Sequence, residues 1–475
     1  LFARGMNPAA KNLSRREMLE WSTWGLTGAA LTNLVQAAPQ PVSHFPAKAK
    51  RVVHVVLMGG LSHIDSFDYK PGLAKAHGKP LQYKERPATF FNQIGLIRKN
   101  DWAFKQRGQS GLWVSDLFPY LATCADELAV VRSMVGTSAN HTPATFEELT
   151  GFQLNGFPGI GSWVSYGLGA ETDNLPTYVV LPDTRGYPAG GTINWSNGFL
   201  PSAHQGVAFG SGDAIIPDLR PAQPIAQDTE AASRTLLSAL NRSDQETFGA
   251  EDALIARMRS HELAARMQLA IPEVADMNRE TAATRERYGP KKNETKDFGR
   301  NCLMTRRLLE KGVRFVQLIS GGSFGSPRIN WDGHEDMRRN HNREAVRIDQ
   351  PVAALIKDLK QRGMLDDTLV VFGGEFGRTA YCQGKLTREN YGRDHHPRNF
   401  CMWLAGGGIK TGMTYGETDD FSYNITRDPV HLNELNATIL HCMGINNQQF
   451  TFPFQGLEQR LTGVEEAHPV KEILA

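Results

Sequence analysis

Short, continuous apolar runs that end in glycine recur along the chain and predict the buried strands of a parallel sheet. Two of the clearest are RVVHVVLMGG at residues 51–60 and DDTLVVFGGEFGRT at residues 366–379, each of which leads into a Gly-Gly pair. Strands that are covered on both faces are apolar at nearly every position, whereas half-exposed strands alternate. The same pattern predicts further strands at residues 128–134, 174–183, 313–320 and 400–408.

Stretches with helical periodicity separate these strands. We predict helices at residues 117–128, 300–311 and 344–363, one that begins within residues 138–151, and a helical stretch at residues 229–288 with a break at Pro272. Residues 185–228, rich in Gly, Pro and Asn, are predicted to form an irregular insertion. Strands that alternate with helices indicate βαβ units. We therefore predict an α/β fold with a mostly parallel central sheet, in one domain over residues 51–475 with a helical excursion at about residues 229–300.

The first fifty residues have a different character. The pair Arg15-Arg16 precedes a weakly hydrophobic run that ends in small residues, which is the pattern of a twin-arginine export signal. A surface helix with two arginines is the alternative. We predict the signal at residues 1–38 and a Pro-rich linker at residues 39–50, so that the twin-arginine machinery exports the chain to the periplasm or the cell exterior. The apolar run is short and broken by polar residues, and we expect no integral membrane span in the mature chain.

Composition narrows the function classes. The 475 residues include 52 Lys and Arg against 50 Asp and Glu, a net charge of +2, so no basic field indicates a nucleic-acid partner. The five cysteines are widely spaced without a C-x-x-C pair, which argues against a zinc ribbon or a thioredoxin-like motif. An odd number of cysteines leaves at least one thiol unpaired.

Side chains that can bind a metal ion occur in three loops that follow strands. The loops carry the sequences GGLSHIDSFDYKP, NWDGHED and, after the strand at 368–373, GGEFGRT followed by GRDHHP. Their candidate ligands are Asp65, Asp332, His334, Glu375 and His395. Carboxylate and imidazole ligands suit a divalent ion, and histidine favours zinc or manganese over calcium or magnesium. We predict one or two such ions, as in two-metal hydrolases; the alternative for Glu375 is an ion pair with Arg378 or Arg393.

The stretch SANHTPATFEELTG at residues 138–151 adds a candidate anion site. Asn140 or Thr142 can cap the helix predicted to begin there. The free backbone N–H groups of a helix start favour a phosphate or sulfate, so we predict that Asn140 and Thr142 contact substrate. A nucleophile at this point would be activated by the metal and by the helix end. An ordinary N-cap without a ligand is the alternative.

Several longer motifs carry a resemblance to a known family. They are GFPGIGSWVSYGLG, CLMTRRLLEKGVRFVQL, DQPVAALIKDLKQRGMLDDTLVVFGGEFGRT, GRDHHPRNFCMWLAGGGIKTG and NATILHCMGI, together with the first two loops above, and they cover nearly all of residues 50–475. The chain resembles the exported proteins catalogued as domain of unknown function 1501, a sulfatase-like branch of the alkaline phosphatase superfamily. The resemblance implies an alkaline phosphatase-like three-layer fold.

The resemblance also implies roles for individual residues. LDDTLVVFGGEFG is similar to the sulfatase strand that ends in Asp-His-Gly, so Glu375 stands where a metal ligand is expected. Asp332, His334 and His395 resemble the later ligands of the superfamily. HTPATFEELTG is similar to the sulfatase segment that carries the nucleophile, and His141 occupies the nucleophile position.

The chain departs from the family pattern in three places. A sulfatase needs Cys or Ser, and a phosphatase Ser or Thr, where this chain has His141. The first strand ends in Gly59-Gly60 where an Asp is usual, and Asp65 is the nearest substitute. Near the carboxyl end, Glu434 and Asn436 stand where an Asp and a His are expected.

The function predicted from these features is that of an exported metal-dependent hydrolase of a phosphate or sulfate ester, with an ester on a polysaccharide as one form of the substrate. Arg378 or Arg393 would contact the anionic oxygens as bidentate donors. Ser62, His141 or a metal-activated water would be the attacking group. The alternative is a non-catalytic exported binding or surface-assembly protein that retains the fold. A phosphomutase or phosphotransferase would share the fold but fits export poorly.

Overall fold

The computed structural model describes residues 42–475 except for 84–85, 87–88, 90–92, 211–214, 216–224, 249–251, 290, 326–327 and 389–390. The predicted export signal at residues 1–38 lies outside the described residues, as do residues 39–41 of the predicted linker. None of the helices in the described part of the chain is long and apolar enough to cross a membrane.

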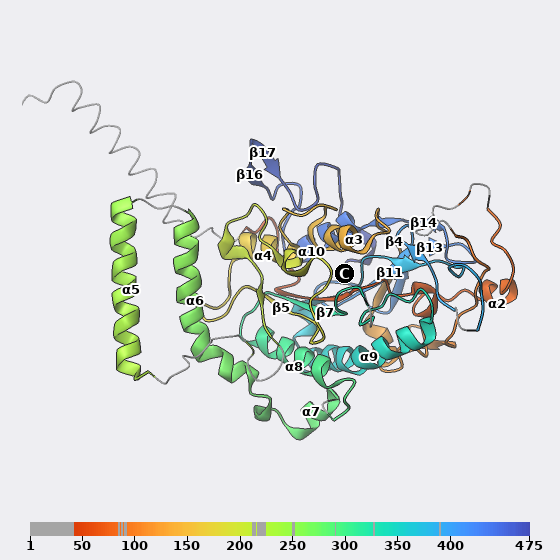
Figure 1. Cartoon of the computed structure of the whole chain (residues 1–475), viewed down its shortest axis with the longest axis horizontal. Coiled ribbons are helices and arrows are strands. Elements are labelled where there is room, and N and C mark those ends of the chain that lie inside the picture. The colour runs from red at the N-terminus through yellow and green to blue at the C-terminus, as the bar shows by residue number, and fades with distance from the viewer. Residues whose placement is uncertain are drawn as a thin grey trace, which may run out of the picture.

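A nine-stranded sheet forms the centre of the molecule (Figure 1). Its strands, in spatial order, are β12 (Met413–Tyr415), β4 (Ala129–Val135), β11 (Phe400–Ala405), β8 (Thr368–Gly373), β1 (Arg51–Leu57), β7 (Phe315–Ser320), β5 (Tyr178–Leu181) and β6 (Val207–Ala208), and β15 (Val430–His431) also pairs with β4. Every pair is parallel except those of β11, which runs antiparallel to β4 and β8. The predicted α/β class with a mostly parallel sheet is therefore confirmed.

The direction of β11 follows from its connection to β8. The chain leaves β8 at the carboxyl edge of the sheet and forms the short hairpin of β9 (Gly377–Arg378) and β10 (His395–His396) there. No helix among the described residues between β8 and β11 carries the chain back to the opposite edge. A parallel neighbour needs such a crossover, so β11 has to run in the opposite direction.

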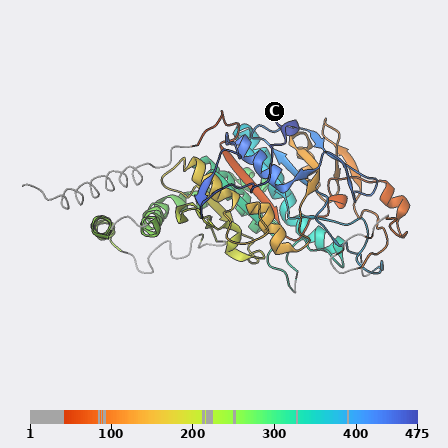
Figure 2. The same cartoon turned by 90° about the horizontal axis from the view of Figure 1, so that it is seen from above.

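Helices cover both faces of the sheet, which produces three layers (Figures 1 and 2). The helices α8 (Lys296–Glu310) and α9 (Met337–Gln361) lie on one face, and α3 (His141–Thr150), α4 (Ile160–Leu168) and α10 (Leu432–Cys442) lie on the other. Alternate residues of β1 enter the two cores: Val53 and Val55 pack toward α8 and α9, whereas Val52 and Val56 pack toward α4 and α10. This double burial explains why the strand is almost continuously apolar.

Two helix predictions differ from the structure, and the helices α4 and α10 were not predicted. The helix expected at 344–363 begins earlier, at Met337, because Asp336 accepts a hydrogen bond from the Arg339 N–H (3.2 Å) and caps it. The segment expected to be a helix at 117–128 is a short 3₁₀ helix, η2 (Leu121–Glu127). The sequences of α4 and α10 were used only as family motifs.

The helical excursion consists of α5 (Gln227–Phe248), α6 (Asp252–Ala275) and α7 (Ala282–Arg287). Helices α5 and α6 stand as a hairpin at one end of the molecule (Figure 1). Pro272 lies inside the last turn of α6 instead of ending the helix before it. The remaining short elements are α2 (Gly72–Ala76), β2 (Phe104–Arg107), β3 (Leu112–Ser115), β13 (Glu417–Thr418), β14 (Ile425–Arg427), β16 (Phe452–Phe454), β17 (Leu457–Gln459) and the 3₁₀ helices η1 (His63–Asp65), η3 (Gly191–Trp195), η4 (Ser202–His204), η5 (Met277–Arg279), η6 (Leu365–Asp367) and η7 (Lys471–Ile473).

All five cysteines are free thiols buried in the protein interior. Burial alone raises the pKa of the Cys442 thiol to about 12, so the thiol stays protonated. These cysteines pack as small apolar residues and offer no thiolate for catalysis or metal binding.

Candidate metal centre

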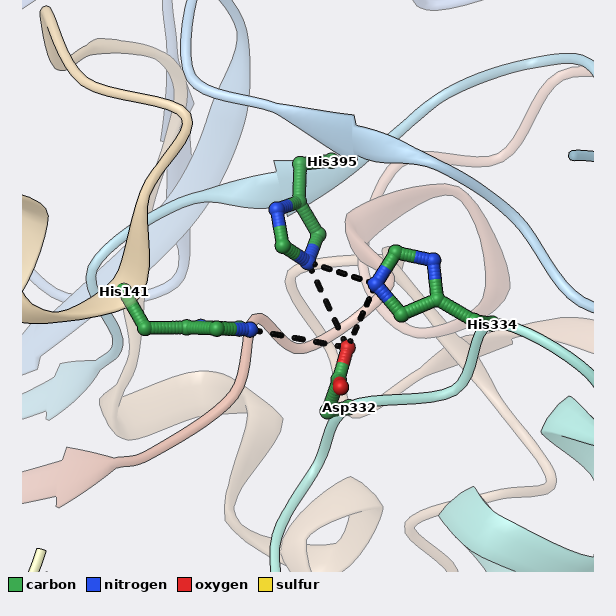
Figure 3. Close-up of side chains that lie close together, drawn as sticks. All are labelled: His141, Asp332, His334 and His395. Atoms are coloured by element: carbon green, nitrogen blue, oxygen red, sulfur yellow. Dashed lines mark hydrogen bonds and ion pairs between the residues drawn. The ribbon is translucent and has the colours of Figure 1, made fainter. Parts of the chain in front are cut away.

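The carboxyl ends of four central strands, β4, β1, β7 and β8, meet at one edge of the sheet, where open α/β sheets bind their ligands. The segments that follow β4, β7 and β8 bring four side chains together there, and Figure 3 shows them pointing toward one another: His141, Asp332, His334 and His395. One ligand atom from each of the four lies within 4.8 Å of the others. Three imidazoles and one carboxylate are a donor set typical of zinc.

The distances within the cluster centre on one oxygen of Asp332. Its Oδ1 lies 2.9 Å from His334 Nε2, 3.3 Å from His395 Nε2 and 3.6 Å from His141 Nε2. The two nitrogens His334 Nε2 and His395 Nε2 are themselves 2.8 Å apart. The four donor atoms therefore lie close to one another, although they come from three separate segments of the chain.

Secondary structure fixes each member. His141 is the first residue of α3, which begins just beyond β4. Asp332 and His334 lie in the loop between β7 and α9, and that loop is held to β1 by a hydrogen bond from the Trp331 N–H to the Met58 carbonyl (2.8 Å). His395 lies in β10, opposite Arg378 of β9.

The hydrogen bonds of His395 test whether a cation fits this site. Its Nδ1 lies 2.6 Å from the Ala139 carbonyl oxygen, which can only accept, so Nδ1 carries the proton of the neutral ring. The lone pair of Nε2 then faces the Asp332 carboxylate and His334 Nε2. Burial, and next the charge of Arg378, hold the pKa of His395 well below its usual value, so the ring stays neutral as a metal ligand must. Electron-rich donors placed this close together are what a cation binds, and the residues fit a divalent ion.

Asp332 is ionised despite its burial. Burial by itself would raise the pKa of this carboxyl, but the charge of Arg378 is the largest of the effects that oppose burial, and the pKa lies far below its usual value. Arg378 is completely buried, and its Nη2 donates to Asp332 Oδ1 (2.8 Å). Its Nε donates to the Gly60 carbonyl (2.9 Å), so the guanidinium anchors Asp332 to the end of β1.

Glu375 supports His141 and is not among the four gathered donors. Its Oε1 lies 2.8 Å from His141 Nδ1 and accepts a hydrogen bond from the Gly59 N–H (2.8 Å). His141 Nδ1 therefore carries a proton, and Nε2 is directed at the cluster. Burial lowers the pKa of His141, but Asp332 and Glu375 outweigh it and raise the pKa above its usual value. Carboxylates that orient a histidine in this way are common behind metal ligands and behind catalytic bases.

Two aromatic rings surround His141. The Phe324 ring stacks on the imidazole with ring centres 3.7 Å apart, and the Phe376 ring lies 5.0 Å away. The Phe324 contact and the Ala139 carbonyl bonded to His395 were missed by sequence reasoning. A main-chain carbonyl has no residue-type signal, and Phe324 lies in a Gly- and Ser-rich loop whose path cannot be read from periodicity.

Asp65, Ser62 and Arg393 form a different buried group and are not brought into the cluster. The Arg393 Nε donates to Asp65 Oδ2 (2.8 Å), and the Ser62 hydroxyl donates to the same oxygen (2.6 Å). The remaining Arg393 donors are used by four main-chain carbonyls, those of Arg98, Lys99, Thr379 and Ala380. The charge of Arg393 is paired and all its N–H groups are bonded within the protein, so this side chain holds three loops together and has no donor left for a substrate.

The two residues predicted to cap α3 do not cap it. Asn140 is the N-cap residue, but no side-chain capping bond is formed, and the side chain is exposed. Thr142 is the second residue of the helix and is half-buried. Pro143 has no N–H group, so the backbone donors of this first turn are those of His141 and Thr142.

Glu434 and Asn436, which stand where the family pattern has an Asp and a His, have no place in the cluster. The Glu434 carboxylate accepts a hydrogen bond from the His431 N–H (2.8 Å) and forms a capping box at the start of α10. Asn436 is buried within the same helix.

The Gly59-Gly60 pair at the end of β1 is explained by close packing. A Cβ on Gly59 would lie 2.6 Å from the Asp332 backbone nitrogen and 2.8 Å from that of Trp331, and the residue has a φ of +112°. A Cβ on Gly60 would lie 2.7 Å from the Phe376 ring. Glycine is needed here because the loop that carries Asp332 rests directly on the β1 backbone.

Replacing Gly59 with alanine is therefore expected to destabilise the protein by about 2–5 kcal/mol, from about 1–2 kcal/mol of backbone strain and about 1–3 kcal/mol of overpacking. Guanidinium unfolding at constant pH measures the loss. Gly78→Ala is the matched control, because Gly78 also has a positive φ (+79°) but has no atom within 4 Å of the added Cβ. Equal losses in the two variants would contradict the packing explanation.

A family model described as "Protein of unknown function (DUF1501)" matches residues 49–474, which confirms the family resemblance. No curated protein matches the chain. Similar solved structures include the PsFucS1 sulfatase from Pseudoalteromonas sp. (12% identity, 94% of this chain and 77% of that chain covered, TM-score 0.34). Others are the lipoteichoic acid synthase LtaP from Listeria monocytogenes (11%, 88% and 75%, 0.36) and a mutant TAB5 alkaline phosphatase with magnesium bound (12%, 84% and 99%, 0.36).

Proposed function

Because the chain belongs to the DUF1501 family, whose function is unknown, its activity has to be inferred from the site, and we propose that it is a metal-dependent hydrolase of phosphate or sulfate esters. The observation that carries the proposal is the convergence of His141, Asp332, His334 and His395 at the carboxyl edge of the sheet. A purely structural protein has little use for a buried carboxylate and three imidazoles directed at one point.

Asp332, His334 and His395 would hold the ion, and zinc suits their chemistry best. Such an ion supplies Lewis acidity to the ester oxygens and lowers the pKa of a bound water. Three protein ligands leave a position for water or substrate, as catalytic zinc sites do, whereas a fourth ligand would close the site. His141 Nε2 is the imidazole nitrogen of the cluster that lies farthest from Asp332 Oδ1, at 3.6 Å.

In this proposal His141 is the general base. Glu375 holds Nδ1 and leaves the Nε2 lone pair directed toward Asp332. Water bonds to the phosphorus or sulfur atom, its proton goes to His141 Nε2, and the bond to the ester oxygen breaks. The proton then passes from His141 to the leaving alkoxide. The Glu375 carboxylate stabilises the imidazolium between these two steps, as a buried carboxylate does in a catalytic triad.

Two features favour an anionic substrate. The positive end of α3 faces the cluster, and the N–H groups of His141 and Thr142 receive no side-chain cap. Ser62 is completely buried and donates its hydrogen to Asp65, which leaves water as the attacking group. We further propose that the enzyme is exported by the predicted signal and that its ester substrate belongs to a polysaccharide.

The test is hydrolysis of p-nitrophenyl phosphate and p-nitrophenyl sulfate, followed by phosphorylated and sulfated oligosaccharides, by the zinc-loaded protein. We expect His141→Gln to lower kcat/KM by about 10²- to 10⁴-fold, the usual contribution of a general base. Its bound zinc should remain near the wild-type amount, because the three proposed ligands are intact. Glu375→Gln keeps an acceptor for His141 Nδ1 and should lose less activity than His141→Gln.

Two outcomes would overturn the proposal. Loss of zinc from His141→Gln would make His141 a fourth ligand and the site a closed structural one. Absence of turnover by metal-loaded wild-type protein on every ester would favour the non-catalytic binding protein that lacks the usual Cys, Ser or Thr nucleophile.

A further inference from the structure

A pocket of about 370 Å³ opens beside the metal cluster. His395 belongs both to the cluster and to the wall of this pocket, so the two are adjacent. The other described residues of the wall that matter here are Thr137, Asn140, His396, Arg398 and Tyr423. Pockets of this size accept a small organic ligand such as a sugar ring, which is larger than a single tetrahedral anion.

The pocket wall carries a positive charge without a compensating carboxylate. Arg398 is exposed, and its side chain is the one formal cation among the described residues that line the pocket, where no Asp or Glu contributes. The Arg398 charge acts on the neighbouring His396 and Tyr423. Burial is the main cause that lowers the pKa of His396, and Arg398 adds to it, whereas burial raises the pKa of Tyr423 and Arg398 opposes that rise. The nearby Asp419 carboxylate is used by its own loop, because it accepts from the N–H groups of Phe421 and Tyr423 (3.1 and 2.8 Å).

Arg398 differs in this from the two arginines that sequence reasoning singled out. Arg378 is bonded to Asp332, and Arg393 is bonded to Asp65 and to four carbonyls. Both are completely buried. Arg398 is in contrast exposed in a pocket and has no ion pair with a described carboxylate, so its guanidinium fork is available for a bidentate contact with a carboxylate, sulfate or phosphate.

The remaining walls suit the polar body of a ligand. The Asn140 side chain supplies amide groups, whereas the Thr137 hydroxyl is already bonded to Glu147 Oε1 (2.7 Å). The His396 and Tyr423 rings stack with their centres 4.6 Å apart and form a flat part of the wall. Asn140 also marks the start of α3, so the positive helix end adds to the field of Arg398.

We infer that this pocket binds a second anionic group of the substrate, beside the ester that is hydrolysed at the metal centre. The inference rests on the proposed function and specifies its substrate class: a sugar with at least two tetrahedral or carboxylate anions on neighbouring positions, as in a polyanionic glycan, in preference to a simple monoester. The first anion reaches the cluster past His395, and the second pairs with Arg398.

The experiment compares a hexose disulfate with the matching hexose monosulfate, and a hexose bisphosphate with the monophosphate, by isothermal titration calorimetry. The protein is zinc-loaded and carries His141→Gln, so that neither ligand is consumed. We expect the ligand with two anionic groups in one pair to bind about 10- to 100-fold more tightly, the factor contributed by a charge-assisted hydrogen-bonded pair. Adding Arg398→Gln should bring the ratio of the two Kd values close to one.

Two control variants sharpen the result. Arg398→Lys keeps the charge but not the planar fork, so it should restore part of the preference. Arg427→Gln removes an arginine of β14 that pairs with Glu417 and Asp428, and it should leave the ratio unchanged. A ratio near one before Arg398 is changed, or a ratio that survives Arg398→Gln, would overturn the inference.

The outcome is separable from that of the proposed function. Turnover of esters without any preference for the ligand with two anionic groups would support the proposed hydrolase and contradict the inference about the pocket. A preference that depends on Arg398 in a protein without turnover would retain the pocket as an anion-binding site and discard the hydrolase. The sulfate and phosphate pairs report which anion the site prefers.

Discussion

Asp332→Asn is expected to bind far less metal than wild-type protein, for which we expect about one equivalent of a divalent ion at the proposed site. Asp332 supplies the one carboxylate of the four gathered donors, and its Oδ1 lies within 3.6 Å of the Nε2 atom of each of the three imidazoles. A structural zinc site contributes about 10–16 kcal/mol in total, so one of the three proposed ligands is worth about 3–5 kcal/mol, or roughly 10²- to 10⁴-fold in affinity. Elemental analysis by mass spectrometry after purification without chelator measures the loss.

The same substitution has a second effect that must be separated from the first. Removing the Asp332 charge leaves the completely buried Arg378 without its carboxylate partner, which typically costs about 3–5 kcal/mol of stability. A protein that lost metal only because it unfolded would be misleading. His334→Gln removes a ligand without removing a charge, and it should lose metal to a similar extent while circular dichroism shows the native fold.

Asp65→Asn is the matched control for Asp332→Asn. Asp65 is also a buried carboxylate paired with an arginine, Arg393 (2.8 Å), and the charges of Arg393 and Arg98 hold the pKa of Asp65 below its usual value although burial would raise it. The two variants therefore suffer the same kind of damage, but Asp65 is not among the gathered donors. We expect Asp65→Asn to retain the metal. Retention by Asp332→Asn, or loss from Asp65→Asn in a folded protein, would place the metal elsewhere.

Steep loss of stability below pH 6 is the second large effect we expect. Burial is the main cause that lowers the pKa of His63 and of His341 to about 3. Each neutral ring donates from one nitrogen and accepts at the other: His63 Nδ1 accepts from the Arg378 N–H (3.4 Å) and His341 Nε2 from the Ser62 N–H (3.0 Å). Protonation would place a second N–H against each of these donors.

The sign of the effect follows from the lowered pKa values. Between pH 6.5 and about 3, the unfolded chain binds protons on these two histidines that the folded chain does not bind, so the free energy of unfolding falls as the pH falls. Two protons correspond to about 2.7 kcal/mol per pH unit, or roughly 9 kcal/mol over the whole interval. This approaches the total stability of a typical domain, about 5–15 kcal/mol, so we expect acid unfolding near pH 4.

Guanidinium unfolding at a series of pH values, on protein treated with EDTA to remove the contribution of metal release, measures the slope. His341→Gln should reduce the slope by about one proton, because glutamine can accept from the Ser62 N–H and donate to the Asn340 amide oxygen without titrating. His468→Gln is the control, since His468 has a side chain that is 67% exposed. An unchanged slope in His341→Gln would show that other groups cause the acid unfolding.

Sequence reasoning found the metal centre only in part. Asp332, His334 and His395 were recognised as candidate ligands, and His141 was singled out as the residue in the nucleophile position. Their assembly into one cluster was not readable, because His141 and Asp332 are separated by nearly 200 residues and meet only through the order of the strands. Residue type identifies what a side chain can bind, whereas strand order decides which side chains share a site.

Glu375 and Arg393 illustrate the same limit. Sequence position placed both after β8, at the edge of the sheet where ligands bind. A carboxylate there can face the metal or support a ligand, and an arginine can face the substrate or tie loops together. The contacts of Glu375 with His141 and of Arg393 with Asp65 depend on distances of a few ångströms between loops, for which periodicity carries no information.

By itself, the sequence determined the strands β1, β4, β5, β7, β8 and β11, the α/β class, and the loops in which the chemistry lies. Continuous apolar runs report double burial, and glycines mark where the chain must pack closely. Only the tertiary structure decided that β11 runs backwards, that Gly59 lies under Asp332, and that the exposed guanidinium beside the site belongs to Arg398. These features arise from the directions and close contacts of segments distant in the chain, and such contacts are set by the packing of the whole sheet and its two helical layers.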